Sequence, residues 1–265
     1  AFSPADEVDT LILDVRQAGE FALGHLPGSG HLPESEWLAR RSELPPRERP
    51  LLVVAENPER SRAAALRLEG MGYARVSALE VPLSALRATL DTSPSRPLWR
   101  PAAALVHAIE RHGVLIPRGP AADLACGSGR DAVWLAQRGF EVEAWDNAPE
   151  SLERARQLAQ VCGVQVTTVP ADLERGTPPL PAARYALLTC FKFLHRPLMP
   201  AIAAALAPQG VLVYQTYRLG QERFGRPLHP KHLLANGELP GAFPALEVLE
   251  YEERDPEAGP ITAML

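Results

Sequence analysis

Short apolar runs separated by polar turns characterise the first third of the chain. The runs Thr10–Val15, Leu51–Ala55 and Arg75–Leu79 predict strands, and the pattern over Arg60–Gly70 predicts a helix. Turn-rich segments lie between them. Together these elements predict a small domain over residues 1–90 of a length that can bury its own core.

Residues 91–98 show no apolar periodicity. The run Asp91-Thr-Ser-Pro-Ser-Arg-Pro97 is rich in proline and serine, which is typical of a linker. From residue 99 to 265 strands and helices alternate at longer spacing. The expected strands are Ala121–Ala125, Glu141–Asp146, Gln165–Pro170, Ala186–Cys190 and Val211–Thr216, and the expected helices are Asp131–Arg138, Pro149–Val161 and Pro197–Leu206.

This alternation predicts a second, α/β domain over residues 99–265. Alternating strands and helices imply a parallel, doubly wound sheet of Rossmann-like type with helices on both faces. At the end of the chain, Leu246–Glu252 and Ile261–Leu265 flank a short turn, and we expect them to form an antiparallel hairpin.

Composition excludes several classes of protein. Hydrophobic residues make up 46% and charged residues 22%, which is typical of a folded globular protein and not of a disordered one. No apolar run approaches the ~18 residues that span a membrane, and no basic, apolar secretory signal opens the chain. A net charge of −5 argues against general binding to nucleic-acid phosphates.

Cysteine usage points to the compartment and away from metal. Cys126, Cys162 and Cys190 form no CxxC pair and no zinc spacing, so no metal site is expected. Such sparse thiols suit the reducing cytoplasm. We therefore expect a cytoplasmic protein that binds neither membrane nor metal.

A glycine loop marks the main candidate site. Gly127 and Gly129 lie between a predicted strand and a predicted helix, where glycine lets the backbone turn and approach a ligand. Asp146 ends the next strand, 19 residues after Gly127. A carboxylate there is placed to accept hydrogen bonds from ribose hydroxyls, so the spacing predicts a nucleoside-type cofactor.

The loop also fits the G-x-G-x-x-A pattern of nicotinamide-dependent enzymes. Two acids favour S-adenosyl-L-methionine instead. Asp123 lies within the first strand, where it would repel a pyrophosphate but could orient an ammonium group. Asp172, followed by Leu173, comes after the third strand and could hold an adenine amino group.

With these acids and the terminal hairpin, residues 99–265 resemble the class I S-adenosylmethionine-dependent methyltransferases. The stretch Gly129-Arg-Asp-Ala-Val-Trp-Leu-Ala136, followed by Arg138-Gly139, is similar to the tellurite-resistance and thiopurine branch, which acts on small molecules. The resemblance implies the fold, the cofactor S-adenosyl-L-methionine and a small-molecule acceptor. The residues it implies as cofactor-binding are Asp123, Ala125, Gly127, Gly129, Arg130, Asp146, Asn147, Asp172, Leu173 and Cys190.

Methyl transfer needs a base only if the acceptor carries a proton. His195, after the fourth strand, is the candidate base; alternatively it caps the following helix or pairs with a backbone carbonyl. Tyr217 ends the fifth strand and could face the acceptor, or serve packing alone. The fourth strand ends Thr189-Cys-Phe-Lys192 where many amino-methylating relatives carry Asn/Asp-Pro-Pro-aromatic, which disfavours nucleic-acid bases and amide nitrogens as acceptors.

The segment from residue 218 to 239 is long and irregular, as lids and binding loops often are. Its arginines, Arg218, Arg223 and Arg226, are compatible with an anionic acceptor or with a solvated charged loop.

The first domain resembles the rhodanese family. The resemblance rests on Leu13-Asp-Val-Arg16, on Gly24-His-Leu-Pro-Gly-Ser-Gly-His-Leu-Pro33 and on Glu59-Arg-Ser-Arg-Ala-Ala64. It implies a small α/β domain in which a cysteine six residues before the loop serine carries sulfur. That position is Ala55, and every cysteine of the chain lies beyond residue 125. We therefore expect a non-catalytic domain that docks a partner protein, binds a ligand or stabilises its neighbour.

The sequence thus predicts a methyltransferase fused to an inactive rhodanese-like domain. Two alternatives stay open: a regulator that binds S-adenosylmethionine or S-adenosylhomocysteine without catalysis, and a nicotinamide-dependent oxidoreductase supported by the glycine loop alone.

Overall fold

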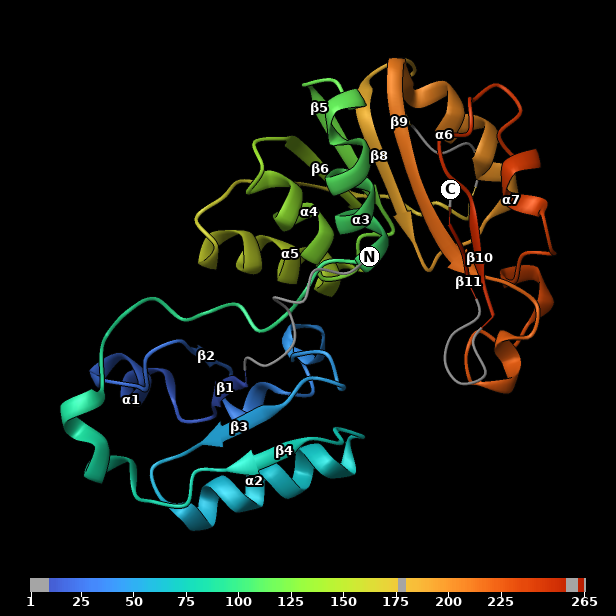
Figure 1. The fold of residues 1–265 in the computed structure, drawn as a ribbon. Coiled ribbons are helices and arrows are strands. Elements are labelled where there is room, and N and C mark those ends of the chain that lie inside the picture. Colours follow the sequence, from blue (N-terminus) through green and yellow to red (C-terminus); the bar gives the residue numbers. More distant parts are fainter. Residues whose placement is uncertain (1–9, 176–179, 256–261, 265) are drawn as a thin grey trace. The chain divides into compact units, whose positions relative to one another are not determined.

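The structure is a computed structural model that describes residues 10–175, 180–255 and 262–264. The chain divides into two compact units, Ala1–Arg100 and Pro101–Leu265, and each is described by itself (Figure 1). Both units are α/β and their central strands are parallel. The α/β class expected for each part of the chain is confirmed.

The first unit contains a four-stranded parallel sheet in the order β2-β1-β3-β4. Its strands are β1 (Leu11–Asp14), β2 (Ser29–His31), β3 (Leu51–Val54) and β4 (Val76–Ala78), and its helices are α1 (Ala18–Leu23) and α2 (Pro58–Gly70). Short 3-10 helices span Glu34–Glu36, Arg41–Glu43 and Leu83–Thr89. The apolar runs of the sequence gave β1, β3 and β4, whereas the three-residue β2 is too short to leave a periodic signal.

Helix α2 begins where its sequence provides a cap. The Asn57 side chain accepts a hydrogen bond from the Arg60 N–H at 3.0 Å, and Pro58 occupies a first-turn position that needs no donor. The helix buries Ala64 and Leu68 against the sheet. These two contacts explain why a helix with a largely polar surface holds its place.

Residues 91–98, expected to form a linker, pack against the first unit. Asp91 and His25 exchange two backbone hydrogen bonds of 2.9 and 3.0 Å, and Leu98 is buried in the core. Gly30 makes room for this segment, because a Cβ there would lie 2.2 Å from the Leu98 Cγ. Backbone hydrogen bonds and the space left by Gly30, rather than apolar periodicity, hold this segment.

The second unit is built on a seven-stranded sheet in the order β10-β11-β9-β8-β5-β6-β7. The strands are β5 (Pro120–Leu124), β6 (Glu141–Asp146), β7 (Thr167–Pro170), β8 (Tyr185–Phe191), β9 (Leu206–Tyr217), β10 (Glu252–Arg254) and β11 (Thr262–Met264). The five strands from β5 to β9 are parallel, and β11 and β10 run antiparallel at the edge.

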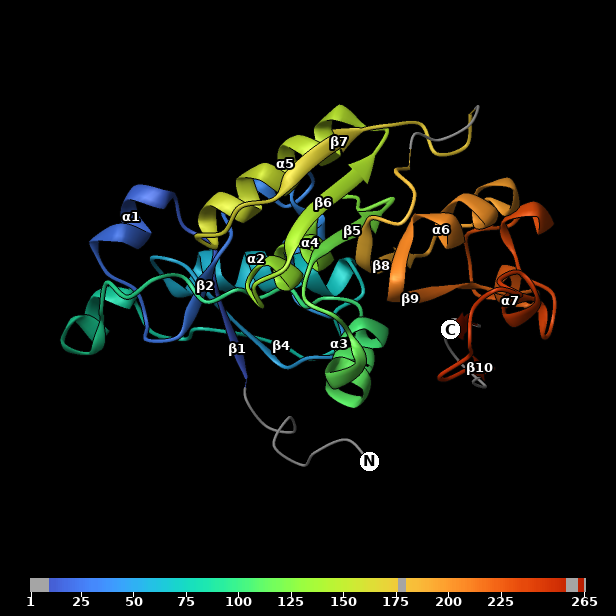
Figure 2. The ribbon, with the colours of Figure 1, turned by 90° about the horizontal axis from the view of Figure 1, so that it is seen from above.

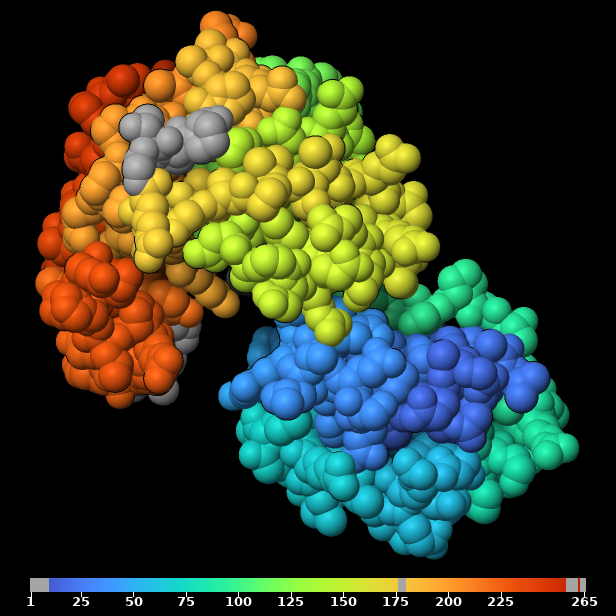
Figure 3. Space-filling view, turned by 180° about the vertical axis from the view of Figure 1, so that it is seen from behind, coloured from blue at the N-terminus to red at the C-terminus, as the bar shows by residue number. Residues whose placement is uncertain are grey.

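Helices cover this sheet. They are α3 (Ala103–His112), α4 (Arg130–Ala136), α5 (Pro149–Val161), α6 (Met199–Ala205) and α7 (Glu238–Gly241), with short 3-10 helices at Gly113–Leu115, Arg196–Leu198, Gln221–Arg223 and Pro230–His232. Helices α4 and α5 pack on β5, β6 and β7 (Figures 1 and 2). In the space-filling view α5 and β7, in yellow-green and yellow, form a continuous outer surface of this unit (Figure 3).

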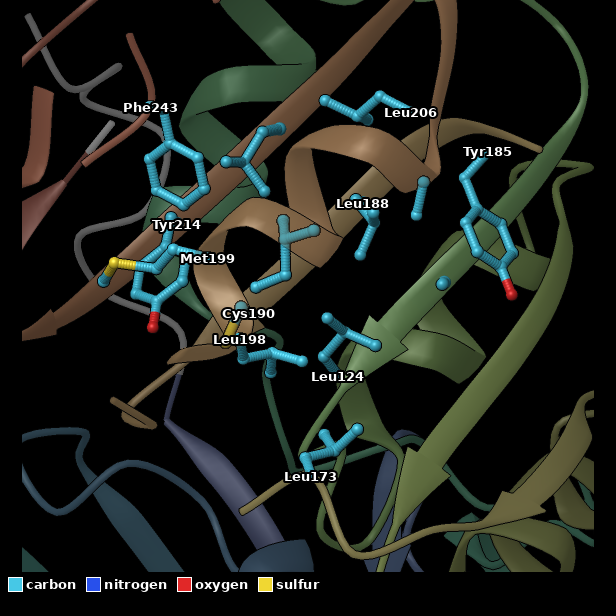
Figure 4. Packing of buried hydrophobic residues seen from close by; sticks show 14 of the residues in the cluster. Leu124, Leu173, Tyr185, Leu188, Cys190, Leu198, Met199, Leu206, Tyr214 and Phe243 are labelled. Atoms are coloured by element: carbon cyan, nitrogen blue, oxygen red, sulfur yellow. The ribbon is translucent and has the colours of Figure 1, made fainter. Parts of the chain in front are cut away.

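The main core lies where α6 packs on β8 and β9. Leu188 from β8, Met199 from α6 and Tyr214 from β9 lie within one buried cluster, and Phe243 closes it beside Tyr214 (Figure 4). The Tyr214 hydroxyl donates to the Phe193 carbonyl at 2.8 Å, so its only polar atom is satisfied.

The terminal hairpin is present but shorter than expected. Strand β10 begins at Glu252, so residues 246–251, expected to be strand, have no strand partner among the described residues. Of the second expected strand, Thr262–Met264 forms β11, whereas Ile261 and Leu265 lie outside the described residues. In the observed register Glu252 lies opposite Met264, so the partners of residues 246–251 would fall after β11.

Within the part of the chain that the structure describes, no helix combines the length and apolar character needed to cross a bilayer. The same residues contain no group of three or more metal-ligating side chains.

Candidate functional site

The candidate site lies where the strand order of the larger sheet reverses. Strand β5 is flanked by β6 on one side and by β8 on the other, so the connections after β5 and β8 leave the sheet in opposite directions. In open α/β sheets ligands bind outside the carboxyl ends of the strands at such a switch point. The glycine loop follows β5 at this position.

Three residues of this loop adopt left-handed backbone angles: Ala125 (φ 53°), Gly127 (φ 54°) and Gly129 (φ 76°). The two glycines have different surroundings. A Cβ on Gly129 would lie 2.5 Å from the Ala155 Cβ of α5, so glycine is needed there for helix packing. A Cβ on Gly127 would meet no atom within 4 Å. The backbone at Gly127 therefore faces open space that a ligand can enter.

Asp146, at the end of β6, joins this loop to α5. Its Oδ2 accepts a hydrogen bond from the Gly127 N–H and its Oδ1 accepts one from the Ala148 N–H, each at 2.9 Å. Both carboxylate oxygens are thus fixed by backbone donors, and each retains acceptor capacity. The arrangement is preorganised to receive two neighbouring hydroxyl donors.

Asp123 lies behind the loop, buried within β5. Its Oδ1 accepts a hydrogen bond from the Thr189 Oγ1 at 2.8 Å, while its Oδ2 has no partner in the described part of the chain. Burial raises the pKa of Asp123 well above its usual range, and the neighbouring carboxylates of Asp131 and Asp146 add to that rise, while hydrogen bonding from Thr189 and from the Ala132 backbone opposes it. A buried acceptor without a donor costs free energy, so a cationic donor bound here would remove that cost.

Asp131, in the first turn of α4, has a structural contact. Its Oδ1 accepts a hydrogen bond from the Ala102 N–H at 2.6 Å, at the beginning of α3. Burial raises the pKa of Asp131, and the cations Arg130 and Lys192 oppose this rise. The Asp131 carboxylate is therefore committed to holding α3, while two cationic side chains lie near it.

Lys192 follows β8 in a left-handed conformation (φ 58°), and its N–H donates to the Gln215 carbonyl at 2.8 Å. Burial lowers the pKa of Lys192, and the positive charge of Arg130 lowers it further. Neither side chain forms an ion pair within 4 Å among the described residues. The site thus contains two cationic side chains, Lys192 and Arg130, without a fixed counter-ion. The sequence did not predict that these two would lie near each other.

The other residues expected to bind the cofactor differ in exposure and in hydrogen bonding. Asn147 is exposed next to Asp146. Asp172 follows β7 and its Oδ1 accepts the Glu174 N–H at 2.9 Å, with Arg175 at 3.5 Å from Oδ2, so this carboxylate stabilises its own turn. Leu173 is buried in the core beside Leu124 (Figure 4). These residues reach the same edge of the sheet as the glycine loop.

Cys190, expected near the cofactor, lies in the hydrophobic core. Its side chain is fully buried in the core cluster between β8 and α6, and burial raises the pKa of its thiol to about 12 (Figure 4). The thiol is therefore part of the hydrophobic core, and a contact between Cys190 and the cofactor stays a prediction. Because side chains alternate along a strand, it is the neighbouring Thr189 that reaches the site and bonds Asp123.

His195 follows the carboxyl end of β8, and Tyr217 is the last residue of β9. The His195 imidazole caps no helix and has no hydrogen-bond partner in the described structure. The Tyr217 hydroxyl likewise has no described partner, and burial raises its pKa. Of the alternatives considered for His195, helix capping and pairing with a backbone carbonyl are both absent among the described contacts.

The segment 218–239, expected to be a binding loop, is fixed at two points. Arg196 reaches across to it: its Nε donates to Glu238 Oε1 at 2.5 Å and its Nη2 donates to the Leu233 carbonyl at 2.9 Å. The second point is Arg218, which bonds Asn236 at 2.9 Å. Hydrogen bonding to Arg196 lowers the pKa of Glu238.

Two of the three arginines of this segment form ion pairs within the protein. Arg218 is buried and also pairs with Glu253 at 3.2 Å, and Arg223 lies 3.7 Å from Asp255. Both are engaged within the protein. Of the three arginines, only Arg226 has a guanidinium group without a described partner, and its backbone carbonyl accepts a hydrogen bond from Gln221 Nε2 at 3.4 Å.

In the first unit, Ala55 follows β3 at the place where the resemblance implies a sulfur-carrying cysteine. Its N–H donates to the Ser61 Oγ at 3.0 Å, and that hydroxyl donates to the Asn57 carbonyl at 3.1 Å. The loop is thus closed by hydrogen bonds, and its position 55 carries a methyl group.

Comparison with protein families matches both units. Residues 121–210 match the family model of a methyltransferase domain, and residues 3–87 match that of a rhodanese-like domain. The chain therefore carries an N-terminal rhodanese-like domain and a C-terminal Rossmann-like methyltransferase domain, each built on a parallel sheet. No curated protein matches the chain.

Similar solved structures include TehB from Haemophilus influenzae, 18% identical, covering 60% of this chain and 59% of that one, with a TM-score of 0.47. A second is an S-adenosylmethionine-dependent methyltransferase from Mesorhizobium loti, 25% identical, covering 44% and 55%, with a TM-score of 0.37. A third is a rhodanese-like domain of the Alr3790 protein from Anabaena sp., 29% identical, covering 30% and 92%, with a TM-score of 0.28. The chain thus spans less than two thirds of the first two structures.

The residues present fit S-adenosyl-L-methionine. The unpartnered, buried Oδ2 of Asp123 offers an acceptor for an ammonium group, the open face of Gly127 gives the close backbone approach, and Asp146 offers two oriented oxygens. Sequence reasoning found these three but missed Thr189 and Arg196. Both act on partners distant in sequence, and no local spacing rule identifies such pairs.

Proposed function

We propose that the C-terminal domain is an S-adenosyl-L-methionine-dependent methyltransferase that acts on a small-molecule acceptor. The observation that carries this proposal is the buried carboxylate of Asp123, with one oxygen unpaired, directly behind a glycine loop tied to Asp146. The match of residues 121–210 to the methyltransferase model supports it.

In this proposal the methionine end of the cofactor lies over Asp123, Gly127 and Gly129, the ribose binds Asp146, and the adenine lies near Asp172 and Leu173. Bound S-adenosyl-L-methionine supplies a methyl group on a sulfonium, which a nucleophile attacks in line. The protein's task is to hold the acceptor collinear with that methyl group and to exclude water.

His195 is the residue we propose to accept the acceptor's proton. Its imidazole has no described partner, so a ring nitrogen is available to accept that proton. Tyr217, half-buried at the end of the neighbouring strand, would border the same acceptor. The closed segment 218–239, held by Arg196, would form the wall that excludes water.

The charges at the site favour an acceptor with anionic character. Lys192 and Arg130 lie beside the glycine loop without fixed counter-ions. This is a different set of cations from the loop arginines that the sequence drew attention to, two of which pair within the protein. Membership in the tellurite-resistance and thiopurine branch would agree with such an acceptor.

The rhodanese-like domain we propose to be an interaction module without sulfurtransferase chemistry, because its cysteine position is Ala55 and the thiolate is the nucleophile in sulfur transfer. The test is a sulfurtransferase assay on the full chain with thiosulfate as donor. Sulfur transfer by a variant lacking Cys126, Cys162 and Cys190 would contradict the proposal.

The test of the main proposal is calorimetric titration of the full chain with S-adenosylhomocysteine, with NADH as control. We expect saturable binding of S-adenosylhomocysteine and none of NADH; binding of NADH alone would overturn the proposal. Transfer of labelled methyl groups to a panel of thiols, selenite and tellurite then tests catalysis. Cofactor binding without any transfer would favour a regulator instead of an enzyme.

A further inference from the structure

Thr189 of β8 lies directly opposite Asp123 of β5. The two residues are partners in the parallel register of these adjacent strands, so their side chains emerge on the same face of the sheet (Figure 1). Both side chains are buried. Their contact is therefore shielded from water, and a hydroxyl beside a carboxylate has a stronger electrostatic effect there than at the surface.

The Thr189 hydroxyl reaches two acceptors. Its Oγ1 lies 2.8 Å from Asp123 Oδ1 and 3.3 Å from the Ala122 carbonyl oxygen. A hydroxyl has one hydrogen to donate and can also accept a hydrogen bond. When Asp123 is ionised, that hydrogen goes to Oδ1, because the charged oxygen is nearer and forms the stronger bond. The other carboxylate oxygen, Oδ2, has no partner among the described residues.

The same three groups also accommodate a protonated Asp123. With the proton on Oδ1, the carboxyl group donates to the Thr189 oxygen, and the Thr189 hydroxyl turns its hydrogen to the Ala122 carbonyl. Both polar hydrogens then have acceptors, as buried donors require. A side chain without a hydroxyl could serve neither protonation state.

The groups around Asp123 favour its protonated form in the protein alone. Burial raises its pKa, and the carboxylates of Asp131 on α4 and Asp146 on β6 add to that rise. Thr189 and the Ala132 backbone oppose the rise by hydrogen bonding. A cation bound at Oδ2 would oppose it as well, so the charge of Asp123 depends on whether a cation is bound.

The other ionisable groups nearby do not exchange protons in its place. Burial raises the pKa of the Cys126 and Cys190 thiols, and the charge of Asp123 adds to both rises. Both thiols therefore stay protonated over the range in which a carboxyl group titrates. The cations Arg130 and Lys192 offset the charge of the neighbouring carboxyl group of α4.

We propose that Thr189 is a positioning residue: its hydroxyl holds the ionised Asp123 with Oδ2 free for the cofactor's ammonium group, and turns to the Ala122 carbonyl when Asp123 is protonated. This inference rests on the proposed function, since the ammonium group belongs to the cofactor. Its consequence is a proton exchange. When the ammonium group binds, the proton leaves Asp123 for the solvent, and the ammonium group keeps all its hydrogens.

The first test follows the Asp123 carboxyl group without any ligand. The full chain is prepared with isotope-labelled aspartate, and its carboxyl signals are followed by NMR across the pH range; the signal absent from Asp123→Asn belongs to Asp123. Thr189→Val keeps the branched shape but removes the hydroxyl. We expect it to raise the midpoint of this titration by about one pH unit or more, because the carboxylate loses a charge-assisted hydrogen bond. Thr189→Ser keeps the hydroxyl and should retain the original midpoint.

Thr216→Val is the matched control. Thr216 is also buried in a strand of this sheet, β9, and has no described hydrogen bond to Asp123. This variant should leave the midpoint unchanged. The proposal is overturned if Thr189→Val has the midpoint of the unchanged chain, or if the two valine variants shift it equally.

The second test uses S-adenosylhomocysteine, which carries the same ammonium group. Calorimetric titration in buffers of different ionisation enthalpy counts the protons released on binding. We expect the unchanged chain to release up to about one proton at pH values between the pKa of Asp123 with the ligand and its pKa without it, and none well above both. Thr189→Val should bind about tenfold more weakly or worse, and Thr189→Ser within about threefold of the unchanged chain.

The outcomes separate this inference from the proposed function. Binding of S-adenosylhomocysteine without proton release at any pH would overturn the proton exchange and leave the cofactor assignment intact. Equal affinity of Thr189→Val and the unchanged chain would overturn the positioning role. If the unchanged chain does not bind S-adenosylhomocysteine, the proposed function is wrong and the positioning role fails with it, while the NMR titration still decides whether the Thr189 hydroxyl stabilises the carboxylate.

Discussion

The Gly127 N–H donates to the Asp146 Oδ2 at 2.9 Å, which ties the loop after β5 to the end of β6. The two residues lie 19 positions apart in sequence: Gly127 follows β5, and Asp146 ends β6, the parallel strand next to β5. The carboxylate that we propose to bind the ribose therefore also sets the position of the glycine loop. One side chain orients two parts of the proposed cofactor site.

This double role predicts a large effect of Asp146→Ala. The variant removes the acceptor for the Gly127 N–H and the proposed acceptors for the ribose hydroxyls, so we expect affinity for S-adenosylhomocysteine to fall by more than tenfold in calorimetric titration. Asp172→Ala is the comparison at the proposed adenine end, where the carboxylate serves its own turn and the loss should be smaller. An unchanged affinity in Asp146→Ala would refute the ribose assignment.

The two loop glycines should respond differently to alanine. Gly129→Ala brings a Cβ within 2.5 Å of Ala155, which costs about 1–3 kcal/mol from overpacking in addition to about 1–2 kcal/mol for the left-handed backbone. Gly127→Ala carries only the backbone cost, because its Cβ would meet open space.

We therefore expect Gly127→Ala to fold with a small loss of stability and yet to lose cofactor binding, since its methyl group occupies the space proposed for the ligand. Chemical denaturation and titration of the same two samples check this. A Gly127→Ala variant that binds S-adenosylhomocysteine normally would remove the close backbone approach from the proposal.

Asp123 should make stability depend on pH. Burial raises its pKa in the folded protein above the ordinary value of about 3.9, so between these two pKa values the folded state binds more protons than the unfolded state. Stability from this group is full below the ordinary pKa and is lost as pH rises through the raised one.

An asparagine side chain does not ionise, so the unfolding free energy of Asp123→Asn should not fall as pH rises from the ordinary to the raised pKa of Asp123. The difference in unfolding free energy between the variant and the unchanged chain should therefore shift in favour of the variant over this pH range. The same variant should bind S-adenosylhomocysteine poorly, because it cannot offer an anionic oxygen to the ammonium group. Denaturation curves across the pH range test the first point. Parallel pH profiles for variant and unchanged chain would contradict it.

Arg196 should limit the local opening of the segment 218–239 and contribute little to the unfolding free energy of the whole protein. Its pair with Glu238 is partly exposed, with side chains 41% and 25% accessible, and solvent screening limits such pairs to about 0.2–1 kcal/mol. We expect Arg196→Ala to unfold near the same denaturant concentration but to be cleaved faster by protease within residues 218–239. Arg156→Ala, which breaks a comparable pair with Glu153 on α5, is the control and should leave that cleavage rate unchanged.

In the rhodanese-like domain, Ser61 closes the loop that begins at Ala55. Its buried hydroxyl accepts the Ala55 N–H and donates to the Asn57 carbonyl. Ser61→Ala leaves a buried N–H without its acceptor, so we expect a loss of about 1–3 kcal/mol in unfolding free energy. Ser77→Ala, at an exposed position with one long hydrogen bond of 3.3 Å, should change it far less.

Most strands and helices could be predicted from local patterns in the sequence. The apolar runs of β1, β3, β4 and β5 to β9 are visible in the sequence because they are signals local to each element, and Pro149 marks the first turn of α5. Helix α3 and strand β2 were not predicted. Strand β2 has three residues, and residues 91–98 are held by hydrogen bonds to distant backbone, which leaves no periodic trace.

In the candidate site, too, some residues could be predicted from local sequence and others could not. Glycine spacing and the acids at the ends of strands come from the chain's own order, so Asp123, Gly127 and Asp146 could be predicted. The burial of the Cys190 thiol, the hydrogen bond from Thr189 to Asp123 and the engagement of Arg218 by Asn236 could not. Each depends on which face of a strand a side chain takes or on a partner 18 or more residues away.

The sequence by itself determined the two domains' α/β character, the glycine loop with its acids, and the absence of cysteine from the rhodanese-like part, because these are properties of residue type and local spacing. Only the tertiary structure decided which oxygen of Asp123 remains unpaired and which arginines are engaged within the protein. The physical reason is that hydrogen bonds and burial are satisfied between segments, and their partners become neighbours only when the sheet is assembled.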